Sequence, residues 1–205
     1  MKRRTLRSPA WLLAALVLTC NACGNGAGTT PENRQSAGWE LTVYYTPVEQ
    51  YHGGPSEAVS DCSGASLGAH PRDFLTRIQT EGFGRLAASI SGKSYLGWDF
   101  DRACWLATTA PLAGNDHGLR PWISTAAHAS IAFGTRLRVA RCGGPIEQVA
   151  CDRVRAANWI VEDRFSGGGG SRNHLDLYIG EEDHPNFEGT DQYYFDARGA
   201  TVKFL

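Results

Sequence analysis

Short runs in which apolar residues alternate with polar ones recur along the chain and predict β-strands. WELTVYYT at 39–46 is rich in β-branched and aromatic side chains, and GTRLRVAR at 134–141 alternates leucine and valine with arginine. NWIVED at 158–163 and HLDLYIG at 174–180 have the same character. The pattern predicts a mainly β domain in which the strands bury their apolar faces.

One stretch departs from this alternation and predicts a single short helix. In PRDFLTRIQTEG, residues 71–82, Pro71 suits a first helical turn and Gly82 suits a helix end. Phe74 and Ile78 have helical spacing and would share one face. We expect that face to pack on the sheet.

Two further regions complete the expected architecture. Residues 50–122 are rich in turns and predict an inserted region within one domain. QYYFDARGATVKFL at 192–205 predicts a hairpin that turns at Arg198 and Gly199. The aromatic anchors of the insertion are Tyr95, Trp98, Trp105 and Trp122. We expect most of these tryptophans to form a satellite core, although one exposed tryptophan would suffice to stack on a sugar.

The N-terminus carries the pattern of an export signal. Basic residues precede an apolar run that is too short to span a membrane. We therefore assign residues 1–22 to a signal peptide, 23–38 to a polar, disordered tether and 39–205 to the folded domain. Cleavage before Cys23 would leave an N-terminal cysteine, as in bacterial lipoproteins, so a lipid anchor at Cys23 and simple secretion are equal alternatives. The expected location is the cell envelope or the medium.

Four cysteines follow the signal, and an even number in an exported chain predicts two disulfides. Of the three connectivities we choose Cys62–Cys104 and Cys142–Cys151, because CGGPIEQVAC can close as a hairpin. The alternative is a zinc site, but no Cys-x-x-Cys spacing supports one. The sequence therefore gives no reason to place a metal ion.

The charge balance argues against some partners. A formal net charge of −1 and a pI near 6.6 provide no basic field that would recruit nucleic acid. EEDH at 181–184 could suggest metal ligands, but an acidic run at a strand end is more typical of a solvated face. We expect a monomer without a cofactor.

Two aspartates, Asp163 and Asp176, flank a run of four glycines within residues 160–180. A phosphate-binding loop would need Gly-Lys-Ser/Thr at the start of a helix, whereas a strand follows here. Calcium-binding repeats need aspartate within the glycine run, and none is present. The glycines instead predict a tight connection between two strands.

The alternation also predicts where the two carboxylates point. It places Asp163 on the face of Trp159 and Val161, and Asp176 on the face of His174. Partial desolvation beside an apolar face would raise the pKa of Asp163, which suits a general acid. The alternative is that Asp163 caps the strand by accepting hydrogen bonds from turn amides.

Three separated blocks resemble known families. STAAHASIAFGTRLRV at 124–139 resembles RlpA-like proteins, and EDRFSGGGGSRNHLDLY at 162–178 is similar to both these and the MltA-type 3D domain. LTVYYTP at 41–47 resembles the first strand of both groups. The resemblance implies a six-stranded double-psi β-barrel exported to the cell envelope. It also implies a peptidoglycan or other polysaccharide partner, since family members include lytic transglycosylases and relatives that bind polysaccharide without cleaving it.

The resemblance also implies roles for individual residues. Asp163 matches the principal aspartate of the family, His128 the histidine of Ala-Ala-His, and Asp176 the aspartate of Asp-Leu. Tyr44 or Tyr45 would line the same groove. The further substrate contacts that we expect are Arg164, His174 and Trp122.

The chemistry of a lytic transglycosylase is compatible with one acidic residue. A hydrolytic glycosidase normally needs two carboxyl groups. A transglycosylase that closes an anhydro ring uses a hydroxyl of the sugar as nucleophile, so one carboxyl can act first as acid and then as base. We expect Asp163 to be that group, with Asp176 and His128 supporting it.

The chain departs from the family pattern at several positions. Phe165 displaces a glycine, Ala132 replaces a proline, and the spacing from Asp163 to Asp176 is longer than usual. Two other classes of function therefore stay open. One is an expansin-like polysaccharide binder without catalysis, and the other is a disulfide-stabilised secreted protease inhibitor.

Overall fold

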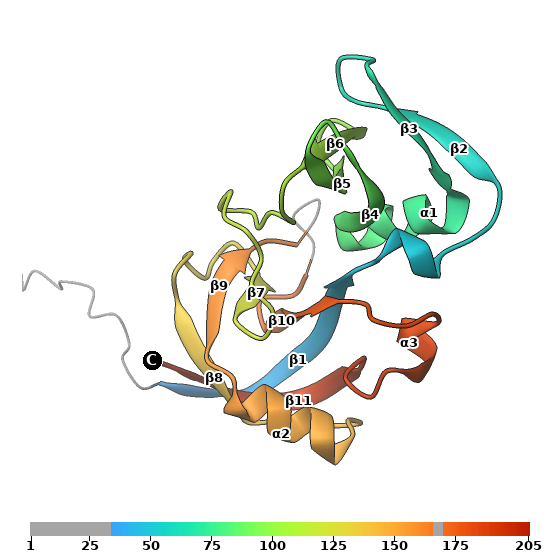
Figure 1. Ribbon diagram of the computed structural model, residues 1–205. Helices are drawn as coiled ribbons and strands as arrows, with labels where there is room; N and C mark the ends of the chain where they lie inside the picture. The colour runs from blue at the N-terminus through green and yellow to red at the C-terminus, as the bar shows by residue number, and fades with distance from the viewer. Residues whose placement is uncertain (1–33, 166–169) are drawn as a thin grey trace, which may run out of the picture. The chain divides into compact units, whose positions relative to one another are not determined.

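The computed structural model describes residues 34–165 and 170–205, and Figure 1 shows the arrangement of their helices and strands. The expected signal peptide, residues 23–33 of the expected tether including Cys23, and residues 166–169 of the glycine-rich connection lie outside the described residues. Within the described part, no helix is both long and apolar enough to cross a membrane.

Six strands close into a barrel in the order β1–β10–β7–β9–β8–β11. The pairs β1–β10 and β7–β9 are parallel, and the other neighbours are antiparallel. This confirms the mainly β fold and the six-stranded barrel. The barrel strands are β1 (Gln35–Thr46), β7 (Ser124–Ala127), β8 (Arg136–Arg141), β9 (Trp159–Asp163), β10 (His174–Glu181) and β11 (Asp196–Phe204).

Alternate residues of the barrel strands fill its interior. Leu41 of β1, Leu175 and Leu177 of β10, and Trp159 and Val161 of β9 are all fully buried in one cluster. Because side chains alternate between the two faces of a strand, the residues between them on β1 and β10 point away from this core. That outer face carries the candidate site.

Helix α2 (Gln148–Ala156) corrects the predicted hairpin between Cys142 and Cys151. The disulfide Cys142–Cys151 itself is confirmed, with a Cα–Cα distance of 5.8 Å. Ala150 and Val154 have helical spacing and are fully buried, so α2 packs an apolar stripe on the barrel. The hairpin prediction used only the two ends of the segment and overlooked this stripe. A third helix, α3 (Phe187–Thr190), also exceeds the single helix that the sequence predicts.

The C-terminal segment forms one strand, not the predicted hairpin. Strand β11 pairs with β1 on one side and β8 on the other, which closes the barrel. Gly199 has a φ of +80° within this strand, where the pairing with β1 shifts register at Trp39. The glycine therefore accommodates an irregularity in a continuous strand. Strand β1 also begins at Gln35, inside the segment assigned to the tether.

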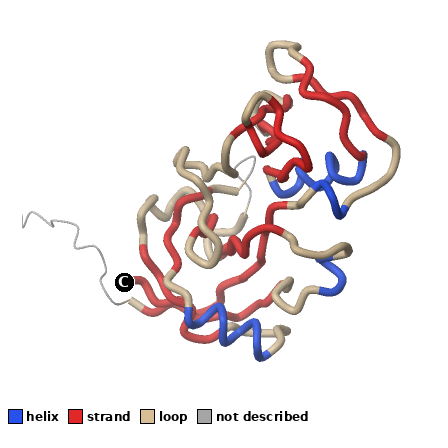
Figure 2. The backbone as a smooth tube through the Cα atoms, viewed as in Figure 1, coloured by secondary structure: helices blue, strands red, loops and turns tan. Residues whose placement is uncertain are grey.

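The insertion between β1 and β7 has its own secondary structure (Figure 2). Its elements are η1 (Glu49–Tyr51), β2 (Ser56–Ser60), β3 (Ser66–Pro71), α1 (Arg72–Glu81), β4 (Phe83–Ile90), β5 (Lys93–Asp99) and β6 (Cys104–Thr108). Strands β2 and β3 form a hairpin, and β4–β5–β6 form a three-stranded sheet. Phe74 and Ile78 of α1 are fully buried with Leu96 of β5 in a second cluster. The predicted helix and its packing face are thus confirmed.

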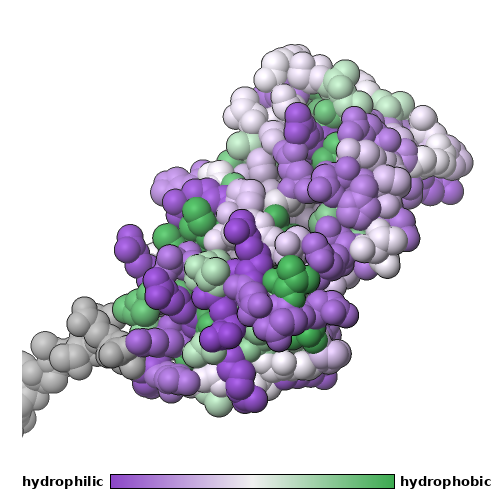
Figure 3. Space-filling view, turned by 60° about the horizontal axis from the view of Figure 1, so that its bottom comes forward, coloured by the Kyte–Doolittle hydropathy of each residue, from purple (hydrophilic) through white to green (hydrophobic). Residues whose placement is uncertain are grey.

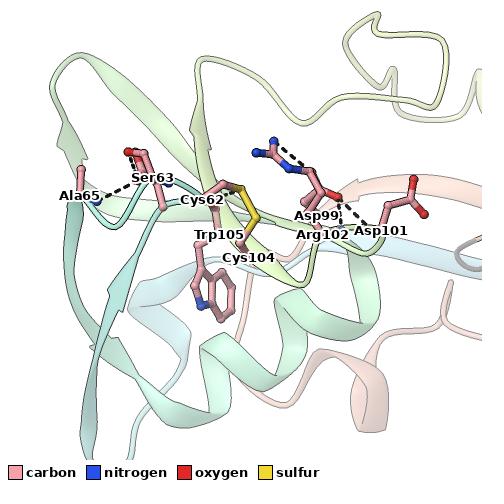
Figure 4. Close-up of a disulfide and its surroundings, with 9 residues drawn as sticks. Cys62, Ser63, Ala65, Asp99, Asp101, Arg102, Cys104 and Trp105 are labelled. Atoms are coloured by element: carbon pink, nitrogen blue, oxygen red, sulfur yellow. Dashed lines mark hydrogen bonds and ion pairs between the residues drawn. A yellow bond between two sulfur atoms is a disulfide. The ribbon is translucent and has the colours of Figure 1, made fainter.

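A second disulfide, Cys62–Cys104, links the β2–β3 turn region to β6, as predicted (Figure 4). Trp98 and Trp105 meet edge to face with ring centroids 4.9 Å apart and pack against the satellite core. Asp99 lies beside this disulfide, but the bonded sulfurs have no thiolate to offer a metal ion. The disulfide therefore stabilises the insertion.

Polar contacts attach the insertion to the barrel. Glu181 at the end of β10 accepts hydrogen bonds from Arg85 and from the Tyr95 hydroxyl, each at 2.6 Å. Next to it, buried Glu182 accepts the Val48 amide at 2.6 Å and contacts His52 Nε2 at 2.7 Å. The surface shown in Figure 3 is mostly hydrophilic, with small separate apolar patches.

Candidate active site

A cleft of about 850 Å³ lies between the outer face of the barrel and the insertion. The barrel contributes Thr42, Tyr44, Ala126, Asp163 and Asp176, and the insertion contributes Glu81, Trp98, Phe100 and Gly114. The cleft thus gathers six carboxyl groups, those of Glu81, Asp163 and Asp176 among them, beside aromatic side chains. A surface of this kind suits a polar ligand with flat apolar faces, such as a sugar chain.

A β-bulge brings Asp163 into this cleft and corrects its predicted orientation. Thr125 of β7 pairs with Val161 of β9, but the next residue, Ala126, pairs with Asp163. The extra residue on β9 is Glu162, which reverses the alternation at the strand end. Asp163 therefore shares the cleft face with Ala126 and does not share the core face of Val161.

Three donors hold the Asp163 carboxylate. Its Oδ1 accepts the backbone N–H of Gly114 at 2.7 Å and that of Arg164 at 2.9 Å. Its Oδ2 accepts the Tyr44 hydroxyl at 2.9 Å. Burial raises the pKa of Asp163, while these three hydrogen bonds oppose the increase. Burial also raises the pKa of Tyr44 well above its ordinary value, so the tyrosine stays a neutral donor.

Asp176 is buried more deeply and has fewer partners. Its Oδ1 accepts the Thr42 hydroxyl at 2.6 Å, and no other side-chain hydrogen bond reaches its carboxylate from the described residues. Burial raises the pKa of Asp176 to about 7, and the negative charge of Asp163 adds to the increase. Near neutral pH this carboxyl group therefore exists in both protonation states.

His174 supports Asp176 from the side. Its Nε2 lies 2.8 Å from the Thr42 hydroxyl, and its ring stacks on Phe165 with centroids 4.5 Å apart. Burial lowers the pKa of His174, which favours the neutral ring. The residue predicted to contact substrate thus touches the hydroxyl that bonds Asp176.

Glu81 lines the cleft, although no pattern in the sequence indicates it as a site residue. It occupies the last position of α1, and its Oε2 accepts the backbone N–H of Tyr45 at 3.3 Å. Burial raises the pKa of Glu81 to about 8, with a smaller contribution from Asp176. The contact depends on how α1 packs against β1, and no pattern within the helix encodes it.

Arg164 lies at the edge of the cleft, but its side chain is already engaged. Its guanidinium lies 3.7 Å from the centroid of the Phe133 ring and donates to the Ile131 carbonyl at 2.9 Å. These contacts hold the loop between β7 and β8 against the end of β9. Arg164 therefore orders the neighbourhood of Asp163 in addition to lining the cleft.

Four predicted site residues are not part of the cleft lining: His174, which reaches it only through Thr42, and three that lie farther away. Tyr45 points into the barrel core and packs on Phe187, with ring centroids 4.8 Å apart, so Tyr44 is the tyrosine that lines the groove. His128 follows β7, and its Nδ1 accepts the Ser130 N–H at 3.1 Å. Trp122 packs against Trp159 at the opposite end of β9.

Solved structures of other proteins have a similar architecture. The chain is similar to E. coli MltA crystallised with bound chitohexaose, at a TM-score of 0.57 and 10% identity, covering 84% of this chain and 74% of that one. It is also similar to a membrane-bound lytic murein transglycosylase from Agrobacterium tumefaciens, at a TM-score of 0.56 and 12% identity, covering 85% and 76%. No family model and no curated protein sequence matches the chain. The chain therefore has an MltA-type barrel fold.

Proposed function

We propose that this protein is a lytic transglycosylase-like enzyme that cleaves peptidoglycan glycan strands in the cleft between barrel and insertion. The observation that carries the proposal is a buried carboxyl group, Asp176, with a pKa of about 7 in a cleft that can hold a sugar chain. A general acid is most effective when its pKa lies near the working pH. The fold shared with MltA, a protein crystallised with chitohexaose, supports a glycan as the ligand.

The contacts of the two aspartates favour Asp176 as the acid, whereas the family resemblance favours Asp163. Both oxygens of Asp163 accept hydrogen bonds, and such bonds stabilise the ionised form. Asp176 is bonded through Oδ1 to Thr42 alone among the described side chains, which leaves Oδ2 to carry a proton. We therefore assign the acid/base role to Asp176 and an electrostatic role to Asp163.

The reaction can then proceed through one carboxyl group. Protonated Asp176 donates its proton to the glycosidic oxygen as the bond from that oxygen to the anomeric carbon breaks. Ionised Asp163 stabilises the positive charge that develops on the sugar. The Asp176 carboxylate next accepts the proton of the sugar hydroxyl that attacks the anomeric carbon and closes the anhydro ring. No water molecule enters the products.

A digestion of purified sacculi tests this assignment. Wild type should release anhydro-muropeptides, and Asp176→Asn should lower the rate by about a thousandfold, the size of a typical general acid–base contribution. Asp163→Asn should retain more activity than Asp176→Asn. Asp101→Asn is the matched control, because Asp101 also lines the cleft but is exposed, and its rate should stay unchanged.

Other outcomes separate the rival functions. Binding of sacculi by all variants without any release of product would contradict the enzyme and support a polysaccharide binder. Failure to bind sacculi, combined with inhibition of a protease, would contradict both sugar-directed functions. A greater loss in Asp163→Asn than in Asp176→Asn would keep the enzyme but reverse the two roles.

A further inference from the structure

A second cavity, of about 600 Å³, lies at the end of the barrel where β7 and β9 begin. Ile123 and Ile160 line it, whereas Ala126 and Asp163 line the active-site cleft. From Ile160 to Asp163 a strand advances by about 10 Å. The two cavities therefore occupy opposite ends of the same pair of strands.

The walls of this cavity are cationic. Arg120, Arg136 and Arg153 all line it, and none of the lining residues is aspartate or glutamate. Within the described part of the chain, Arg136 and Arg153 form no ion pair with an acidic side chain or with the carboxylate of Leu205. This local excess of positive charge occurs in a chain whose formal net charge is −1.

Two of the three arginines are held in place. The Arg120 guanidinium donates to buried Glu162, with Nη2 2.5 Å from Oε1. The same carboxylate accepts the Ser124 hydroxyl at 2.6 Å. The Arg153 guanidinium lies over the Trp122 ring, 4.9 Å from its centroid. Pre-positioned guanidinium groups lose little freedom when they bind an anion.

The backbone of Trp122 has a left-handed conformation, with a φ of +60°. A bulky residue adopts this conformation rarely, and such strained residues cluster at binding sites. The Trp122 N–H donates to the Tyr178 carbonyl at 2.9 Å, which fixes the residue at the mouth of the barrel. Its ring contributes an apolar wall beside the arginines.

Apart from Asn158, the remaining lining is apolar, and it narrows the class of ligand that the cavity can bind. Ile123, Ala156, Trp159 and Ile160 line the cavity among the arginines. A ligand that matches both features must combine anionic groups with small apolar groups. A short peptide with carboxylate side chains meets this requirement, because guanidinium groups bind carboxylates in pairs of parallel hydrogen bonds. A phosphate polymer offers the charge but lacks the apolar groups.

We propose that this arginine cavity binds a short peptide that carries carboxylate groups. The proposal does not depend on the function of the cleft, since its residues are separate from those of the cleft lining. It adds a binding site for a second chemical class of ligand at the other end of strands β7 and β9.

Calorimetric titration of the whole protein tests the proposal. The probe is a blocked tetrapeptide of alternating alanine and glutamate, and the comparison probes are its glutamine counterpart and inorganic phosphate. The glutamate peptide should bind more tightly than either. Arg136→Gln and Arg153→Gln should each weaken binding about threefold, and the double variant about tenfold, as expected for partly exposed charge pairs.

The control variant is Arg155→Gln, because Arg155 is exposed on α2 but does not line the cavity. It should bind the glutamate peptide like wild type, and all variants should keep the wild-type unfolding temperature. Equal loss in Arg155→Gln, unchanged binding by the double variant, or equal affinity for the glutamine peptide would overturn the proposal. Equal affinity for phosphate would do so too, by pointing to a general anion site. Rates on peptide-free glycan strands should be unaffected, which separates this test from that of the cleft.

Discussion

The two ends of strands β7 and β9 differ in charge, although the same barrel builds both. At the cleft end, Asp163 and Asp176 are half-buried, with backbone amides and hydroxyl groups as partners. At the other end, arginines line the cavity and the balancing carboxylate of Glu162 is buried beneath Arg120. Glu162 and Asp163 are neighbours in sequence, yet Glu162 pairs with Arg120 of the cavity whereas Asp163 lines the cleft. The bulge in β9 therefore separates an acidic environment at the cleft from a basic environment at the arginine cavity.

After Asp176→Asn, the largest expected effect also concerns the cleft end. Asp163→Asn removes the negative charge that helps to raise the pKa of Asp176 and stabilises the charged sugar. Cleavage should slow by about tenfold or more. In the proposed mechanism Asp176 must be protonated, so activity should fall as pH rises through about 7 in wild type and at a lower pH in the variant. Rates measured across pH check this, and an unmoved or raised midpoint contradicts the coupling between the two carboxyl groups.

A smaller effect should appear at the arginine end. Glu162→Gln keeps the size of the side chain but removes the charge that Arg120 and Ser124 contact. The free energy of unfolding should fall by about 1–2 kcal/mol, since a mostly buried carboxylate loses charge-assisted hydrogen bonds. Urea denaturation measures the change, with exposed Glu147→Gln as the control. An equal change in the free energy of unfolding of both variants would show that the buried Glu162 carboxylate does not specifically stabilise the arginine end.

The smallest expected effect concerns Glu81 at the cleft end. Its pKa is raised to about 8 in the folded protein, so the unfolded chain releases this proton first as pH rises. Wild type should therefore lose stability as pH rises from about 5 to about 8. Glu81→Gln cannot titrate, so its stability relative to wild type should increase over that range. We expect on the order of 1 kcal/mol, less than the full linkage of about 1.4 kcal/mol per pKa unit, because Glu81 is partly exposed and solvent screens its charge. Parallel pH profiles of unfolding in the two proteins would contradict burial of a titrating Glu81, and Asp101→Asn provides an exposed control.

Much of the barrel could be predicted because its signal is local. Alternation in NWIVED and HLDLYIG identifies β9 and β10, and the stripe of Phe74 and Ile78 identifies α1. The sequence does not predict α2. Two cysteines and a Gly-Gly-Pro turn favour a hairpin there, and the helical spacing of only two apolar residues that pack inward is a weaker signal.

The candidate site could be predicted only in part. The order of the blocks suggested that Asp163 and Asp176 belong together, and the cleft contains both. The orientation of Asp163 could not be predicted, because a bulge depends on pairing with β7 and leaves no mark on alternation within β9. Glu81 was missed for a related reason: its partner, the Tyr45 amide, is distant in sequence.

The bulge also has an evolutionary consequence. Glu162 is the extra residue at this bulge. Because it is left out of the pairing with β7, the aspartate that follows it faces the cleft and not the packed barrel interior. If Glu162 instead paired regularly with Ala126, the bulge would close and the next carboxylate would turn inward without any change in the residues of the cleft. A related chain without the bulge could therefore keep every cleft residue in aligned sequence and still lose the cleft carboxylate, so the pairing of this strand is as informative about the site as the identity of its residues.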